Sequence, residues 1–155
     1  MPTRAPKRKR GTLRQFTARF ATNAEIASWD DHVIASPGGG NLLQSASFAS
    51  VKAKHGWKPL YLVYEGTTVL DGAEAPFASY NLVLEKSVPA LGKIWYMIKG
   101  PGVNSVEEIP AILDANKDFI KREKLGVFAV KIEPDIRYTR RSRQSHPDRP
   151  HFLAF

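Results

Sequence analysis

The spacing of apolar and polar positions changes along the chain, and these changes predict the order of its first elements. Residues 16–20 alternate apolar and polar side chains, which is the period of a half-buried strand. Apolar side chains then recur at helical spacing over 23–35, where Thr22 and Glu25 have the spacing of a capping box. A proline and three glycines at 37–40 end this stretch. We therefore predict a strand, a helix and a glycine loop.

The next stretch predicts a second helix and an antiparallel meander. Either Ser45 or Ser47 caps the helix, which runs to about His55 and ends at Gly56. Apolar, β-branched and aromatic residues separated by turn residues then indicate strands that pair in sequence order. The predicted strands cover 60–64, 67–70, 79–85 and 93–98, with a turn at residues 65–66 between the first two.

The last periodic stretch predicts a helix and a buried strand. Residues 107–124 have a mostly helical apolar period, with acidic residues early and basic residues late, as the helix dipole favours. Residues 127–132 are nearly all apolar, which is typical of a strand buried on both faces, and Pro134 closes it. The order of elements predicts an α+β fold with a mixed, largely antiparallel sheet flanked by helices.

The periodicity divides the chain into one folded domain and two tails. Residues 1–14 read as a basic disordered tail, 15–136 as the domain, and 137–155 as an irregular basic tail. A chain of 155 residues with 43% hydrophobic content can bury one core. No apolar stretch is long enough to cross a bilayer, and no signal peptide is visible, so we expect a cytoplasmic protein.

Composition excludes several kinds of site. The chain has no cysteine, so it can form neither a disulfide nor a thiolate nucleophile. Asp30, Asp31 and His32 are adjacent on a predicted helix, where neighbouring side chains point in different directions, so they form no shared metal site. We expect neither a metal nor a cofactor.

The net charge of +8 is concentrated at the two ends of the chain. Residues 1–10 carry +5 and residues 137–155 carry +4, so the part between them carries −1. Such ends attract phosphate groups of nucleic acid or of anionic lipid through a salt-sensitive term that does not depend on sequence. Solvated tails remain the simpler interpretation. The candidate nucleic-acid contacts are Lys7, Arg8, Lys9, Arg10, Arg140, Arg141 and Arg143.

Three short motifs in the middle of the chain carry the candidate chemistry. Lys52 lies on the second predicted helix, close to a glycine-rich loop, where a mobile cation suits a diphosphate or a carboxylate. Gly100 and Pro101 follow a strand and allow the main chain to approach a ligand closely. Glu133 stands at the end of the last strand, where open sheets place functional side chains. By themselves these residues also fit an exposed helix lysine, a tight turn and a structural carboxylate.

These residues belong to three segments in order: Gln44 and Lys52 with Gly56 to Pro59, then Trp95 to Gly102, then Val130 to Pro134. Their order and spacing resemble the N-terminal domain of the Fem family. Its members are aminoacyltransferases that build peptidoglycan cross-bridges, and the resemblance covers about Trp29 to Pro134. It implies a fold related to N-acetyltransferases, and transfer of an amino acid from aminoacyl-tRNA to an amine of a UDP-linked or lipid-linked muropeptide precursor. A lipid-linked acceptor would place the protein at the inner face of the membrane. The implied substrate-binding residues are Gln44, Lys52, Trp57, Lys99, Gly100, Pro101 and Glu133.

The resemblance leaves the catalytic group unassigned. Glu133 is the one candidate base, but positioning of substrate, or an ion pair with Lys131 or Arg137, is the more natural role for it. Phe128 also stands where some members of the family carry a tyrosine, and a phenyl ring cannot donate that hydrogen bond.

The expected activity of the isolated chain is limited. Fem proteins normally continue into a second related domain, and that domain is missing from this chain. We therefore expect precursor binding without turnover, because contacts from one side do not orient two substrates. One alternative is an acetyl-CoA-dependent N-acetyltransferase, although the Gln/Arg-x-x-Gly-x-Gly/Ala loop of that class does not occur here. Another is a non-enzymatic module that binds RNA or an anionic surface through its basic ends.

Overall fold

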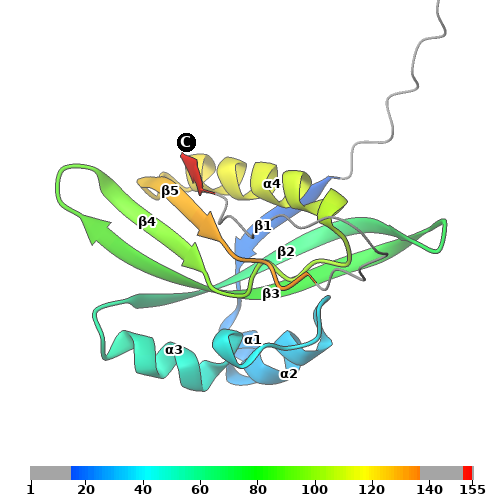
Figure 1. Cartoon of the computed structure of the whole chain (residues 1–155), viewed down its shortest axis with the longest axis horizontal. Helices are drawn as coiled ribbons and strands as arrows, with labels where there is room; N and C mark the ends of the chain where they lie inside the picture. Colours follow the sequence, from blue (N-terminus) through cyan, green and yellow to red (C-terminus); the bar gives the residue numbers. More distant parts are fainter. Residues whose placement is uncertain (1–14, 137–151, 155) are drawn as a thin grey trace, which may run out of the picture.

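The computed structural model describes residues 15–136 and 152–154, which form one twisted sheet with helices on both faces (Figure 1). One-turn 3-10 helices at Leu42–Gln44 and Val106–Glu108 precede α3 and α4. The other elements are, in chain order, β1 (Phe16–Phe20), α1 (Asn23–Ala27), α2 (Trp29–Ala35), α3 (Ala46–Ala53), β2 (Lys58–Leu70), β3 (Ala73–Val88), β4 (Gly92–Met97), α4 (Ile109–Arg122), β5 (Val127–Ile132) and β6 (Phe152–Ala154).

The strands pair in the order in which they occur in the chain. The sheet runs β1-β2-β3-β4-β5-β6, and its neighbours are antiparallel except for β4 and β5. Those two strands are parallel because α4 carries the chain back across the sheet between them, as a parallel connection requires. The predicted α+β class with a mixed, largely antiparallel sheet is therefore confirmed.

Alternating side chains on the central strands build a separate core on each face of the sheet. On the upper face in Figure 1, strand residues such as Leu62 and Trp95 pack against Ile112 of α4. On the lower face, Trp29 of α2 packs with Leu82 of β3, and α1, α2 and α3 cover this side. Burying a large apolar side chain of this kind contributes about 1.5–3 kcal/mol.

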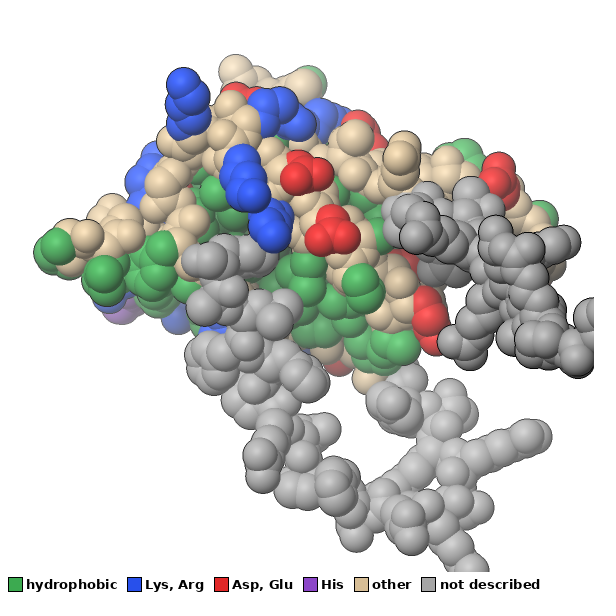
Figure 2. All heavy atoms as spheres, turned by 90° about the horizontal axis from the view of Figure 1, so that it is seen from above, with side chains coloured by type: hydrophobic (Ala, Val, Ile, Leu, Met, Phe, Trp, Pro, Cys, Tyr) green, Lys and Arg blue, Asp and Glu red, His purple; other side chains and the backbone are tan. Residues whose placement is uncertain are grey.

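Helix α4 is strongly amphipathic. Its buried positions include Ile112, Phe119 and Ile120, which recur at helical spacing and face the sheet. Seen from above, lysine, arginine and acidic side chains are scattered among hydrophobic and other side chains on this side of the molecule (Figure 2). Within the described residues, no helix combines the length and the apolar content needed to cross a bilayer.

The predicted turn at Glu65-Gly66 is wrong. Strand β2 continues through both residues, and Gly66 pairs with Phe16 of β1. A Cβ atom at Gly66 would lie 2.5 Å from the ring of Phe16, so close packing between strands requires this glycine. The chain turns instead at Asp71-Gly72, where both residues have positive φ angles, as tight hairpins favour.

The structure shows where the first predicted helix is interrupted and which residues cap the first and third helices. The helix predicted over 23–35 is interrupted at Ser28, which separates α1 from α2. The capping box is present, since the Glu25 amide donates to Thr22 Oγ1 and the Thr22 amide donates to the Glu25 carboxylate. Ser45, rather than Ser47, caps α3 by accepting from the Phe48 amide.

The strands at the end of the chain also differ from expectation. In β5 only Val130 and Ile132 are buried, because the helices of the lower face lie under β1, β2 and β3. No element was predicted after residue 136, yet Phe152–Ala154 pairs antiparallel with β5. The expectations of disorder over 1–14 and of irregular chain over 137–151 lie outside the described residues.

Candidate functional site

A polar cavity of about 440 Å³ lies at the carboxyl ends of β4 and β5. Three segments surround it: the glycine loop at 37–40, the loop from β4 to α4, and the chain after β5. Its lining residues are Val33, Ser36, Pro37, Gly38, Gly39, Gly40, Asn41, Gln44, Tyr80, Asn81, Lys99, Pro101, Gly102, Val103, Asn104, Ser105, Asp135 and Ile136.

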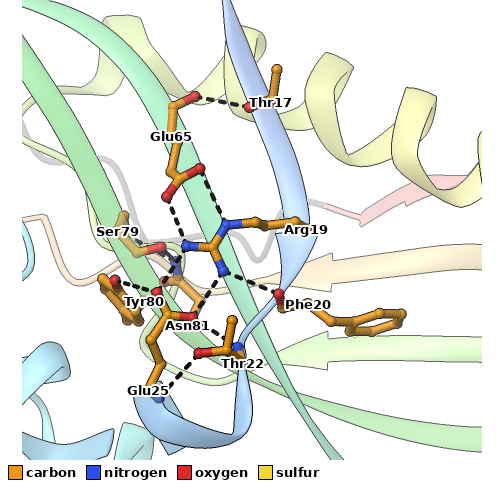
Figure 3. Close-up of polar contacts among 9 residues, drawn as sticks. All are labelled: Thr17, Arg19, Phe20, Thr22, Glu25, Glu65, Ser79, Tyr80 and Asn81. Atoms are coloured by element: carbon orange, nitrogen blue, oxygen red, sulfur yellow. Dashed lines mark hydrogen bonds and ion pairs between the residues drawn. The ribbon is translucent and has the colours of Figure 1, made fainter.

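Two buried polar residues of β3 hold the wall of the cavity. The amide of Gly102 donates to Asn81 Oδ1 at 2.8 Å, and Ser79 Oγ donates to the Gly102 carbonyl at 2.7 Å. Asn81 Nδ2 donates in turn to Ser79, so the two side chains fix each other (Figure 3). A Cβ atom at Gly102 would lie 2.5 Å from the Pro37 carbonyl oxygen, so the two loops meet where only glycine fits.

Gln44 lines the cavity, and its side chain makes hydrogen bonds to the main chain that a neighbouring strand would otherwise make. The β3–β4 ladder ends at Leu84 and Tyr96, and the strands separate beyond that point. There the Gln44 side chain accepts from the Leu82 amide at 2.7 Å and donates to the carbonyls of Leu82 and Ile98. Gln44 is only 4% exposed, so its amide group is committed to the main chain.

The predicted Lys-Gly-Pro motif lies at the mouth of the cavity. Lys99, with a positive φ angle, and Pro101 line it, and Lys99 is exposed. The Gly100 carbonyl accepts from the Glu133 amide at 3.0 Å, which ties this loop to the end of β5. On the other side Asp135 accepts from Asn41 Nδ2 at 3.2 Å. The mouth therefore presents one lysine and one carboxylate together with main-chain groups.

A buried carboxylate stands just before the first turn of α4. Glu108 is 1% exposed and accepts from the Asn104 amide at 2.8 Å and from the Thr68 hydroxyl. A helix start offers free amides that normally attract anions. The Glu108 side chain instead bonds the preceding loop and β2, and it makes no capping hydrogen bond to the amides at the start of α4.

Trp57 and Glu133 do not line the cavity but are linked through Tyr96 on the lower face of the sheet. Lys131 Nζ lies 4.3 Å from the centre of the Tyr96 ring and 2.9 Å from the Glu133 carboxylate, while the rings of Trp57 and Tyr96 are 6.4 Å apart. The hydrogen bond from Lys131, together with Tyr96, lowers the pKa of Glu133. Glu133 is therefore a weak base, and the expected pair with Lys131 is present; Arg137 lies outside the described residues.

Lys52 also lies apart from the cavity. It is half-buried on α3, where its ammonium group lies 5.3 Å from the centre of the Phe48 ring. Its carbonyl accepts from the Trp57 amide at 3.2 Å, which closes the end of the helix. The seven predicted substrate-binding residues thus divide into a group at the cavity and a group around α3 and the lower sheet face.

Sequence reasoning missed the residues that build the cavity wall. Ser79 and Asn81 lie two residues apart in the buried part of β3, and polar side chains at alternate positions of a buried strand were the available signal. Glu108 had no such signal, because it precedes a helix like any ordinary acidic residue. The candidate nucleic-acid residues of the two tails lie outside the described residues.

Within residues 15–136 and 152–154, no three His, Cys, Asp or Glu side chains are grouped as metal ligands would be. Neither a protein-family model nor a curated protein matches this chain.

Proposed function

We propose that this chain provides the precursor-binding part of a Fem-type aminoacyltransferase, built on an acetyltransferase-like sheet. The observation that carries the proposal is the cavity at the carboxyl ends of β4 and β5, the only parallel pair among the described strands. Open sheets bind ligands where neighbouring parallel strands end and their connections diverge. One of the three motifs that suggested the family, which contains Lys99, Gly100 and Pro101, stands at this cavity.

The residues that line the cavity suit the polar and charged groups of a muropeptide precursor. The glycines at 37–40 allow main-chain groups to approach a ligand, and Asn41, Asn104 and Ser105 offer polar side chains. Lys99 supplies one positive charge for a phosphate or a carboxylate. A catalytic base is not part of the proposal, because Glu133 is ion-paired and lies away from the cavity. In this proposal, the contacts that orient the acceptor amine toward aminoacyl-tRNA come from a second domain outside this chain.

Acetyl-CoA serves as the contrasting ligand. The element order from β1 to β5 is compatible with an acetyltransferase, but the sequence lacks the Gln/Arg-x-x-Gly-x-Gly/Ala loop that would hold the pyrophosphate. We therefore expect no saturable binding of acetyl-CoA.

Titration of the full chain with a UDP-linked muropeptide, followed by amide NMR shifts, tests the proposal. We expect saturable shifts in residues 37–41 and 99–105, and Lys99→Ala should weaken binding about tenfold, the effect of losing one well-placed charge pair. Lys117→Ala, an exposed substitution on α4, should leave binding unchanged.

Three results would decide against parts of this assignment. Absence of saturation by the muropeptide would remove the proposed function. Weakening by Lys52→Ala but not by Lys99→Ala would move the site to α3. Turnover of aminoacyl-tRNA by this chain alone would contradict the need for a second domain.

A further inference from the structure

The hairpin between β3 and β4 ends in an exposed apolar tip. Pro89, Ala90 and Leu91 are all exposed, and Leu91 is 65% exposed. The strands pair up to Val88 and Gly92, so the tip is a short, rigidly supported turn. In Figure 1 this turn forms the left end of the molecule and projects beyond the ends of the helices that cover the sheet. The three exposed residues are consecutive, so they form one small apolar surface at a protruding turn.

Basic side chains surround the base of this hairpin. Lys86 and Lys93 lie on its two strands, and Lys58 lies on the adjacent end of β2. Lys86 Nζ is 5.3 Å from the Trp57 ring, which brings the end of α3, with Lys54, to the same side. The Lys93 amide donates to the Gly126 carbonyl, so the basic last turn of α4 also ends here.

The acidic side chains near the hairpin are already engaged. The buried Glu85 carboxylate accepts from Trp95 Nε1 at 2.8 Å and lies 3.5 Å from Lys93 Nζ and 3.9 Å from Lys58 Nζ. Glu123, after α4, is paired with Arg122 at 3.1 Å. Lysine and arginine side chains outnumber these two carboxylates, so the surface around the apolar tip carries a net positive charge.

The other long hairpin provides an internal comparison. The turn between β2 and β3, at the right end of Figure 1, also exposes apolar side chains, including Leu70 at 44%. Its neighbours are Asp71 and Glu74, which are acidic. The two ends of the sheet thus expose similar apolar tips with opposite charge. In the view from above, hydrophobic side chains lie at the left tip, and basic side chains lie between this tip and the middle of the molecule (Figure 2).

We propose that the β3–β4 hairpin docks on an anionic lipid bilayer, with Leu91 inserted at the boundary between headgroups and acyl chains and the lysines at the headgroups. Lysine side chains near an anionic leaflet each strengthen binding by about fivefold, and their long apolar stems tolerate the boundary region. Single-stranded nucleic acid fits less well, because it needs exposed rings for stacking. The Trp57 ring is instead covered by Lys86, and Leu91 offers no ring.

The test uses the absence of cysteine in the chain. Leu91→Cys and Leu70→Cys, each labelled with a polarity-sensitive fluorophore, are mixed with vesicles of phosphatidylglycerol and phosphatidylcholine, and separately with phosphatidylcholine alone. We expect a blue shift only for the label at position 91, and only with phosphatidylglycerol. Both tails are identical in the two proteins, so their charge does not affect the comparison.

Unlabelled variants give a second, quantitative measure. In vesicle sedimentation, Leu91→Ser should lower the partition coefficient about tenfold and Lys86→Ser about fivefold, whereas Leu70→Ser and Lys117→Ser should leave it unchanged. Equal shifts at positions 70 and 91 would overturn the proposal. So would competition by single-stranded RNA together with an unaffected Leu91→Ser variant, since these would indicate a polyanion surface without insertion.

Discussion

Gln44 shows how one side chain replaces main-chain pairing inside the sheet. Its amide group spans the gap between β3 and β4 and satisfies groups of Leu82 and Ile98 that no strand reaches. Unpaired buried main-chain groups are costly, so the cavity above this gap depends on the glutamine. Gln44, which the family resemblance assigns to substrate binding, therefore has a structural role.

Replacing Gln44 should destabilise the protein strongly. Gln44→Ala leaves the Leu82 amide and two carbonyls without their partner, and we expect the free energy of unfolding to fall by about 2–4 kcal/mol. Urea denaturation followed by fluorescence measures this loss. Gln15→Ala changes an exposed glutamine and should stay within about 0.5 kcal/mol of the parent protein. Equal effects of the two substitutions would contradict the bridging role.

At the scale of elements, one arginine joins β1, α1 and β2. Arg19 of β1 donates to both carboxylate oxygens of Glu25 and of Glu65 at 2.8–3.2 Å (Figure 3). Tyr80 of β3 also donates to Glu25, at 2.9 Å. The hydrogen bonds from Arg19, and then the one from the Thr22 amide, hold the pKa of Glu25 below its usual range. This cluster fixes the short helix α1 against the sheet edge.

The cluster predicts a specific dependence on pH. Because the folded pKa of Glu25 is lowered, its stabilisation is complete above the unfolded pKa, about 4.3, declines below it, and is fully lost only once the pH has fallen through the folded value. Arg19→Met should therefore lower the free energy of unfolding by about 1–2 kcal/mol at pH 7 and by about half as much at pH 2.5. Thermal unfolding across this range measures the difference.

The control for this prediction is Lys117→Met, which removes an exposed positive charge from α4. It should show a small difference from the parent protein at both pH values. A constant penalty for Arg19→Met from pH 7 to pH 2.5 would indicate lost packing rather than a lost ionic cluster.

At the scale of the whole molecule, two cores share one sheet. The upper core contains Leu62 and Ile112, and the lower core contains Leu82 and Trp29, yet β2 and β3 contribute to both. Loss of either core exposes a face of the same strands. The described fold is therefore expected to unfold as one unit, as small domains usually do.

Substitutions in the two cores should affect the same transition. Ile112→Ala and Leu82→Ala each remove a fully buried side chain and should cost about 2–5 kcal/mol, whereas Ile34→Ala, at a 65% exposed position, should cost little. Far-UV circular dichroism and tryptophan fluorescence should give coincident urea transitions for every variant. Separate transitions, with Leu82→Ala shifting only one, would show that the faces unfold independently.

Local signals predicted much of the fold but little of the site. The bounds of β1, the capping box at Thr22 and the strand at 127–132 were predicted correctly, because each depends on residues close in sequence. The motif at residues 99–101 lies at the cavity, and its role in substrate binding stays a prediction. Trp57 and Lys52 were grouped with it, but the fold places both around the end of α3, away from the cavity.

Local patterns in the sequence were sufficient for the α+β class, for β1 and β5 and for the capping box at Thr22, since alternation and capping act over a few residues. Only the tertiary structure decided why Gly66 must be a glycine, since its neighbour Phe16 is distant in the chain. It also decided that Gln44 bridges two strands and that Ser79 and Asn81 hold Gly102. These contacts join segments separated by tens of residues, and no local pattern specifies which buried polar groups will meet.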